Sequence, residues 1–165
     1  MTRRIFAIAV TLLGLPALVA AAAPKRLINV DRDGVAVDGY DVVAYFTEQA
    51  PVPGRPDLTS VHDGATYRFA SAEHKAMFDA APAKYVPAFG GFCAYAVSRK
   101  ALRPIDPAIF HFVDGRLFLQ HTKKAFDLFE RDEAGNTKKA DANWPRLVEK
   151  KADKYRAGQF DEPVK

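Results

Sequence analysis

The sequence predicts an α+β domain, in which a small antiparallel sheet packs against short helices and a C-terminal helical tail. The Asp-Gly pairs at 33–34, 63–64 and 114–115 lie between apolar segments and indicate β-hairpins, because both residues of such a two-residue loop need a positive φ angle. A segment with helical spacing of apolar residues separates the second pair from the third. Basic amphipathic segments follow the last pair and complete the prediction.

The hairpin at Asp114-Gly115 is predicted in most detail. A two-residue loop there places four apolar residues on one face of the hairpin: Phe110, Phe112, Leu117 and Leu119. His111 lies on the opposite face, and we expect it to be exposed or half-exposed. The pair Asp63-Gly64 predicts a second hairpin with His62 on the same face as Tyr67, and Asp33-Gly34 predicts a third.

Between the second and third hairpins the sequence predicts a helix over residues 71–81. Ser71 is a good N-cap, and Pro82 ends the helix. His74 and Met77 share its apolar stripe, since residues three apart lie on one face. A shorter helix is predicted from Asp41. The tail is predicted to form two helices, over 122–132 and 137–156, broken near Gly135.

The first residues have the layout of a secretory signal peptide. Arg3 and Arg4 precede an apolar stretch over 5–15, and small residues follow over 20–23. We expect cleavage near Ala22 rather than a retained membrane anchor, because Gly14 and Pro16 interrupt an apolar run that is marginal for a bilayer. The predicted organisation is therefore a signal peptide over 1–22, one domain over 23–157 and a frayed tail over 158–165, with export to the periplasm or beyond.

Charge excludes one class of function. The 165-residue chain has 24 Lys and Arg against 20 Asp and Glu, and loss of Arg3 and Arg4 leaves a net charge of +2. A nucleic-acid-binding surface needs a clustered basic stripe, so we expect no nucleic-acid partner. We expect the tail lysines to form a solvated face, and no membrane span to remain after signal cleavage.

Cys93 is the first candidate for chemistry, since it is the only cysteine and cannot form an internal disulfide. It follows Gly90-Gly91, where the backbone can approach a neighbour closely. A lone thiol is either buried and inert or chemically active. His74 and Met77 are further soft donors, and thiolate, thioether and imidazole together suit copper.

Several motifs resemble those of the YHS domain family, and in particular its stand-alone exported bacterial branch. The stretch 67–71, the spacing of Phe78, Pro82 and Tyr85, and the segments 39–46, 90–95 and 141–145 carry the resemblance. It covers nearly the whole mature chain and implies a link to heavy-metal handling. Members of the copper-pump type have three cysteines where this chain has Ala44, Ala70 and His74, so their three-thiolate site is absent. Some relatives have selenocysteine in place of Cys93, which implies a functional residue there.

The leading hypothesis is a periplasmic protein that binds a soft metal ion, copper(I) above all, and exchanges it with a partner. Cys93 is the main expected ligand, and His74 and Met77 assist it. Whether the protein is an enzyme stays open, because no established catalytic motif is present.

Two alternatives remain open. In the first, Cys93 is a thiol-redox residue that is oxidised and then reduced by a partner, which requires an exposed thiol with a lowered pKa. In the second, the domain is a non-catalytic binding module with an aromatic groove. The candidate groove residues are Tyr40, Tyr45, Tyr67, Phe92 and Tyr95.

Overall fold

The structure, a computed structural model, describes residues 25–155 and 157–159. The predicted signal peptide and residues 160–165 of the predicted tail lie outside the described residues. The α+β class is confirmed, with two separate two-stranded antiparallel sheets and several short helices in the described part of the chain. Among residues 25–155 and 157–159, no helix has both the length and the apolar character needed to cross a bilayer.

The elements follow one another along the described chain without an internal repeat. In order they are η1 (Val37–Gly39), α1 (Ala44–Thr47), β1 (Arg55–His62), β2 (Ala65–Phe69), α2 (Ala72–Ala80), α3 (Pro82–Tyr85), η2 (Ala88–Gly91), α4 (Ala94–Ser98), β3 (Asp106–Val113), β4 (Arg116–Gln120), α5 (Lys123–Glu130), α6 (Glu133–Lys151) and η3 (Ala152–Lys154). The η elements are short 3₁₀ helices.

Two of the predicted hairpins are confirmed in their register. In β1–β2, His62 faces Ala65 across the Asp63-Gly64 turn, and in β3–β4, Val113 faces Arg116 across the Asp114-Gly115 turn. Both aspartates have the positive φ angle that such a turn requires.

The hairpin predicted at Asp33-Gly34 is wrong, since only an isolated bridge joins Val30 to Ala36 among the described residues there. The carboxylate of Asp31 accepts hydrogen bonds from the backbone N–H groups of Asp33 and Val35. This side-chain turn replaces a strand ladder, because an aspartate can compete with the backbone for its own neighbours.

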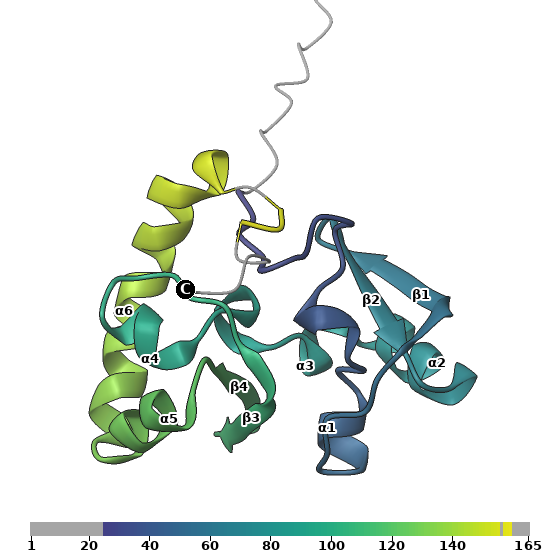
Figure 1. The fold of residues 1–165 in the computed structure, drawn as a ribbon, viewed down its shortest axis with the longest axis horizontal. Coiled ribbons are helices and arrows are strands. Elements are labelled where there is room, and N and C mark those ends of the chain that lie inside the picture. Colours follow the sequence, from purple (N-terminus) through teal and green to yellow (C-terminus); the bar gives the residue numbers. More distant parts are fainter. Residues whose placement is uncertain (1–24, 156, 160–165) are drawn as a thin grey trace, which may run out of the picture.

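The molecule has two ends joined through β3–β4 (Figure 1). One end, the hairpin half, consists of α1, β1, β2 and α2. The other end, the helical half, consists of α4, α5 and α6, with the long helix α6 along the outer edge. The short helices α3 and η2 lie in the chain segment that connects the two halves.

The β3–β4 hairpin separates two apolar clusters. Leu117 and Leu119 belong to a cluster that includes Tyr45, Phe78 and Cys93 of the preceding elements. Phe118, from the other face of β4, belongs to a second cluster with residues of η2, α4, α5 and α6. Both faces of this hairpin are therefore covered.

His111 is half-exposed, as predicted, although residues of α5 pack against its ring. Its ring lies 5.1 Å from that of Phe126 and 5.2 Å from that of Phe129, measured between ring centroids. Both ring nitrogens are buried without a hydrogen-bond partner. Burial lowers the pKa of His111 from its ordinary value of 6.5, although the charges of Glu133 and Glu130 oppose the shift. Sequence alternation correctly placed His111 opposite Phe110 and Phe112 but did not show that α5 covers that face.

The helix predictions are confirmed in outline. Ser71 caps α2 by accepting the N–H of His74, and Pro82 starts the next helix. The break in the tail lies at Asp132 rather than at Gly135, because the Asp132 carboxylate accepts the N–H of Gly135 and starts α6 at Glu133. Gly158, the first residue of the predicted frayed tail, is buried and donates its N–H to the carbonyl of Val30.

His111 should make the fold sensitive to acid. Because the folded pKa lies below 6.5, the neutral ring contributes stability above pH 6.5, and this contribution is lost as the pH falls through the folded pKa. The variant His111→Phe keeps a ring in the same place but cannot take up a proton. We expect the difference in melting temperature between His111→Phe and the parent chain to grow as the pH falls below 6.5. A difference that is independent of pH would contradict the proposed environment.

Candidate functional site

Cys93 lies inside the protein, where only 1% of its surface is exposed. It directly precedes α4, and its backbone N–H donates to the carbonyl of Arg103. Its thiol donates to Oε1 of Gln120, with a distance of 3.3 Å between sulfur and oxygen. Gln120 is itself fully buried and comes from the end of β4. The thiol is thus a packed residue with a hydrogen-bond partner in the interior.

Burial raises the pKa of the Cys93 thiol above its ordinary value of 9.0. Backbone N–H groups of Ala96, His121 and Tyr95 and the charge of Arg103 act in the opposite direction, but burial outweighs them. A thiol with a raised pKa carries little thiolate at neutral pH, and the thiolate is both the nucleophile and the metal ligand.

The amide of Gln120 has one unused group beside this thiol. Its Oε1 accepts hydrogen bonds from Cys93 and from the N–H of Tyr95, whereas its Nε2 is buried with no partner. Reversing the amide would direct an N–H₂ group at the N–H of Tyr95, so the backbone fixes its orientation. The missing partner is a cost, because a buried unsatisfied donor loses its hydration without compensation.

His74 takes part in a different interaction. Its Nδ1 lies 2.7 Å from Oδ2 of Asp41, and its Nε2 lies 3.3 Å from Oγ1 of Thr47. The His74 side chain is 13% exposed, whereas that of Asp41 is fully buried. Both ring nitrogens of His74 therefore lie within hydrogen-bond distance of protein oxygens.

Asp41 joins three parts of the hairpin half. One carboxylate oxygen accepts the N–H groups of Val43 and Ala44 at the start of α1. The other accepts the N–H of Ala70, just after β2, and contacts the imidazole of His74 on α2. A carboxylate that is taken fully out of water needs such partners, and here it has four.

Met77, the third predicted metal ligand, packs against the apolar cluster that contains Cys93. The described residues contain no group of three or more His, Cys, Asp and Glu side chains that could hold a metal ion. In this structure the Cys93 thiol forms a hydrogen bond with Gln120, and the His74 ring lies within hydrogen-bond distance of Asp41. Copper(I) binding by Cys93, His74 and Met77 stays a prediction.

The aromatic residues named for a groove take different places. Tyr45 and Phe92 are fully buried and belong to the core. Tyr40 and Tyr95 pack at the edges of the apolar clusters. Tyr67 lines a cleft that we call the aromatic cleft.

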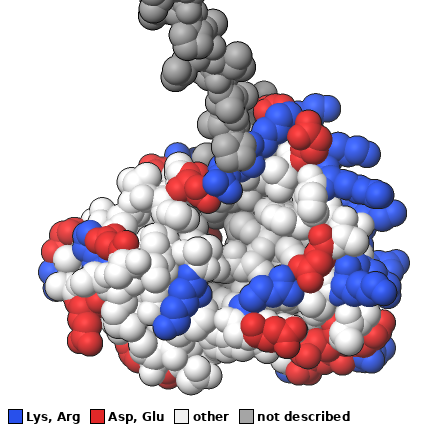
Figure 2. Space-filling view, turned by 180° about the vertical axis from the view of Figure 1, so that it is seen from behind, with Lys and Arg blue, Asp and Glu red and all other residues white. Residues whose placement is uncertain are grey.

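The aromatic cleft has a volume of about 210 Å³. It is lined by residues from the N-terminal segment, the β1–β2 hairpin, the segment before η2, η2 itself and α6: Lys25, Arg26, Leu27, Ile28, His62, Asp63, Tyr67, Val86, Pro87, Phe89, Gly90, Trp144 and Val148. Residues of both halves meet here. Figure 2 shows a hollow in a mostly uncharged region of the surface, below the point where the grey trace reaches the described residues.

The inner wall of the cleft depends on two consecutive residues with left-handed backbone. Phe89 has φ 54° and Gly90 has φ 58°. A Cβ atom on Gly90 would lie 2.1 Å from the carbonyl oxygen of Leu27 and 3.2 Å from the Trp144 ring. The close approach predicted from the glycine pair therefore exists, and its neighbours are Leu27 and Trp144.

Charged groups lie at the mouth of the cleft. The Arg26 guanidinium is 3.2 Å from the Asp63 carboxylate, and Nε2 of His62 is 3.6 Å from the same carboxylate. The Phe89 and Trp144 rings meet edge to face at 6.1 Å deeper in the wall. The sequence analysis did not identify Leu27 and Trp144 as cleft residues. The glycine pair indicated a close approach at Gly90, but it did not indicate which residues make that approach.

Comparisons with models of protein families, with curated proteins and with solved structures found no match to this chain. The resemblance to YHS domains rests on the motifs alone and stays a prediction.

The burial of Cys93 leads to a test of its reactivity. We expect iodoacetamide to alkylate Cys93 at least about 100-fold more slowly in the folded protein than in urea, because the thiol must first be exposed. The rate in the folded protein should rise with pH without levelling off at pH 9.0, since the folded pKa is raised. Fast alkylation that levels off below that pH would show an exposed, activated thiol.

The role of Asp41 leads to a test of stability. Asp41→Ala leaves three backbone N–H groups and an imidazole without their acceptor. We expect the free energy of unfolding in urea to fall by about 3 kcal/mol or more. Asp57→Ala is the matched control, because Asp57 is exposed and pairs with an exposed Arg55. Equal stability of the two variants would contradict the role given to Asp41.

Proposed function

We propose that this protein is a non-catalytic binding module whose aromatic cleft accepts a small aromatic molecule. The observation that carries the proposal is the cleft itself, where Tyr67, Phe89 and Trp144 from three separate parts of the chain surround one hollow. Binding sites for small molecules are concave and mainly apolar, with a few polar groups that fix orientation. The aromatic cleft has these features.

Its size limits the ligand. A volume of about 210 Å³ is below the roughly 300–1,000 Å³ of pockets that hold drug-sized molecules. A single substituted ring fits this limit better than a nucleotide or a large cofactor. Edge-to-face contacts with Phe89 and Trp144 would favour an aromatic ring over an aliphatic one of the same size.

Polar groups around the cleft favour a ligand with a hydroxyl group. Tyr67 is almost fully buried and lines the cleft. Burial raises the pKa of Tyr67, which keeps the hydroxyl protonated and able to donate. At the mouth, His62 and Asp63 offer further hydrogen-bonding groups. We propose that these groups orient a phenol-like molecule.

The backbone strain at Phe89 supports a binding role. The left-handed backbone conformation of Phe89 costs about 1 kcal/mol or more of folding free energy. Such conformations are kept only where the surrounding structure holds the residue in place. Here Asn29 holds the segment, because its N–H donates to the carbonyl of Gly90 and its amide to that of Gly91. The strained residue lines the cleft, and its ring packs against those of Phe118 and Trp144.

The Cys93 hypotheses keep their own tests. Metal binding and thiol redox chemistry both need access to a sulfur that is 1% exposed, and both therefore need a local opening around α4. We place them below the binding module for this reason.

The binding proposal is tested with p-cresol as the probe. Trp144 is the only tryptophan of the chain and lines the cleft, so its fluorescence reports occupation directly. We expect a saturable change in emission on titration. In Val148→Phe the added ring occupies the cleft, and affinity should fall at least about tenfold.

Val61→Phe is the matched control, because Val61 is 74% exposed and does not line the cleft. No saturable change with the parent chain, or equal weakening in both variants, would contradict the proposal. A parallel titration with copper(I) under a competing chelator separates the hypotheses. Saturable copper binding that is lost in Cys93→Ser would support the metal hypothesis instead.

A further inference from the structure

A second cleft lies between the loop that follows α4 and the end of α6. It has a volume of about 390 Å³ and shares no lining residue with the aromatic cleft. Four cationic side chains line it: Lys100, Arg103, Lys151 and Lys154. No Asp or Glu belongs to its described lining, and we call it the basic cleft.

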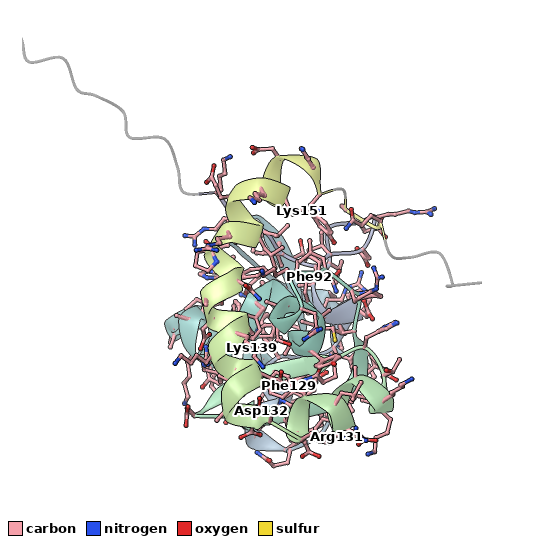
Figure 3. All side chains as sticks on the ribbon, turned by 90° about the vertical axis from the view of Figure 1, so that its left-hand side faces the viewer. Phe92, Phe129, Arg131, Asp132, Lys139 and Lys151 are labelled. Carbon is pink, nitrogen blue, oxygen red and sulfur yellow. The ribbon has the colours of Figure 1, made fainter. Side chains whose placement is uncertain are left out.

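In the part of the chain that the structure describes, the four cations of the basic cleft form no ion pair. Other lysines of the chain do, such as Lys25 with Glu149 and Asp153. Cationic side chains gather along the edge formed by α6 (Figure 2), and Lys139 and Lys151 lie on this helix at different levels (Figure 3). Like charges around one hollow repel each other, so an anion there is favoured.

Lys100 occupies a position that normally belongs to glycine. It has φ 63° two residues after the end of α4. Its N–H donates to the carbonyl of Val97, and the N–H of Ala101 donates to that of Ala96. This is the Schellman arrangement, in which the left-handed residue is usually glycine because a Cβ is strained there. The chain instead has a lysine that lines the basic cleft, at a cost in stability.

The wall that carries Lys100 is held against α6. The amide of Asn143 donates to the carbonyls of Val97 and Ser98, at 3.1 Å in both cases. These carbonyls lie in the last turn of α4, and that of Val97 also accepts the N–H of Lys100. The Asn143 side chain therefore joins the end of α4 to α6. The opposing cations therefore have a defined spacing before any ligand arrives.

We propose that the basic cleft binds a small molecule that carries two or more phosphate groups. Four positive charges around about 390 Å³ call for a ligand of high charge density. Each phosphate carries about −1.5 to −2 charges at neutral pH, so two phosphates neutralise the four cations within a small volume. A dicarboxylate carries only about half of this negative charge. The apolar side chains of Ala101 and Leu102 add a surface for an organic part of the ligand.

The test is calorimetric titration of the purified full chain with tripolyphosphate, with citrate as the carboxylate comparison at equal ionic strength. We expect saturable binding of tripolyphosphate that weakens with added salt and is at least about tenfold tighter than that of citrate. The double variant Lys151→Glu with Lys154→Glu should weaken it at least about tenfold. The matched control is Lys124→Glu with Lys138→Glu, an equal change of charge at exposed residues outside the basic cleft.

A second variant separates binding from folding. Lys100→Gly removes one cation and relieves the left-handed strain, so it should raise the melting temperature while it weakens tripolyphosphate binding. Loss of binding by unfolding cannot produce these opposite changes.

Several results would overturn the proposal: no saturable binding, equal weakening in the two double variants, or citrate bound as tightly as tripolyphosphate. Tighter binding of an acidic peptide or of a single-stranded oligonucleotide than of tripolyphosphate would overturn it in favour of a macromolecular partner.

Discussion

The buried carboxylate of Asp41 is the interaction on which the hairpin half depends. It accepts hydrogen bonds from the start of α1, from the end of β2 and from His74 on α2, and it has no contact with water. Without it, N–H groups at the start of α1 and after β2 and one ring nitrogen of His74 would lose their partner. Because β2 carries Tyr67, which packs on Phe78 of α2 with ring centroids 5.0 Å apart, Asp41 also sets one wall of the aromatic cleft.

The other walls depend on how the chain crosses between the halves. Phe89 and Gly90 turn the backbone into the left-handed region, and Asn29 ties this turn to the N-terminal segment. Trp144 of α6 then closes the wall from the helical half. The aromatic cleft therefore exists only when both halves are packed together, which joins its geometry to the stability of the whole domain. The basic cleft lies elsewhere, between the end of α4 and α6, and depends on different residues.

Local patterns in the sequence predicted the local structure well. The Asp-Gly turns specified the register of both hairpins, and Ser71 and Pro82 marked the ends of α2, because these signals act within a few residues. Burial was harder to predict. Alternation correctly predicted a half-exposed His111, but it did not show that α5 packs against the ring, because this contact depends on packing between segments that the sequence does not show.

The candidate site was predicted less well than the fold. Cys93, His74 and Met77 were grouped by the softness of their donor atoms, whereas hydrogen bonds bring Cys93 to Gln120 and His74 to Asp41. The glycine pair before Cys93 correctly indicated a close approach, but the partners, Leu27 and Trp144, are distant in sequence. Spacing along a chain shows which residues share one element, and it does not show which elements meet.

Chemical-shift mapping tests the aromatic cleft most directly. In amide NMR spectra of the chain recorded with increasing p-cresol, the account predicts that the largest shifts cluster at residues of the cleft wall, among them Tyr67, Phe89 and the indole N–H of Trp144. Amides of the exposed turn at Asp114-Gly115 should stay unchanged. Shifts spread evenly over the surface, or centred on Cys93 and α4, would contradict the central claim.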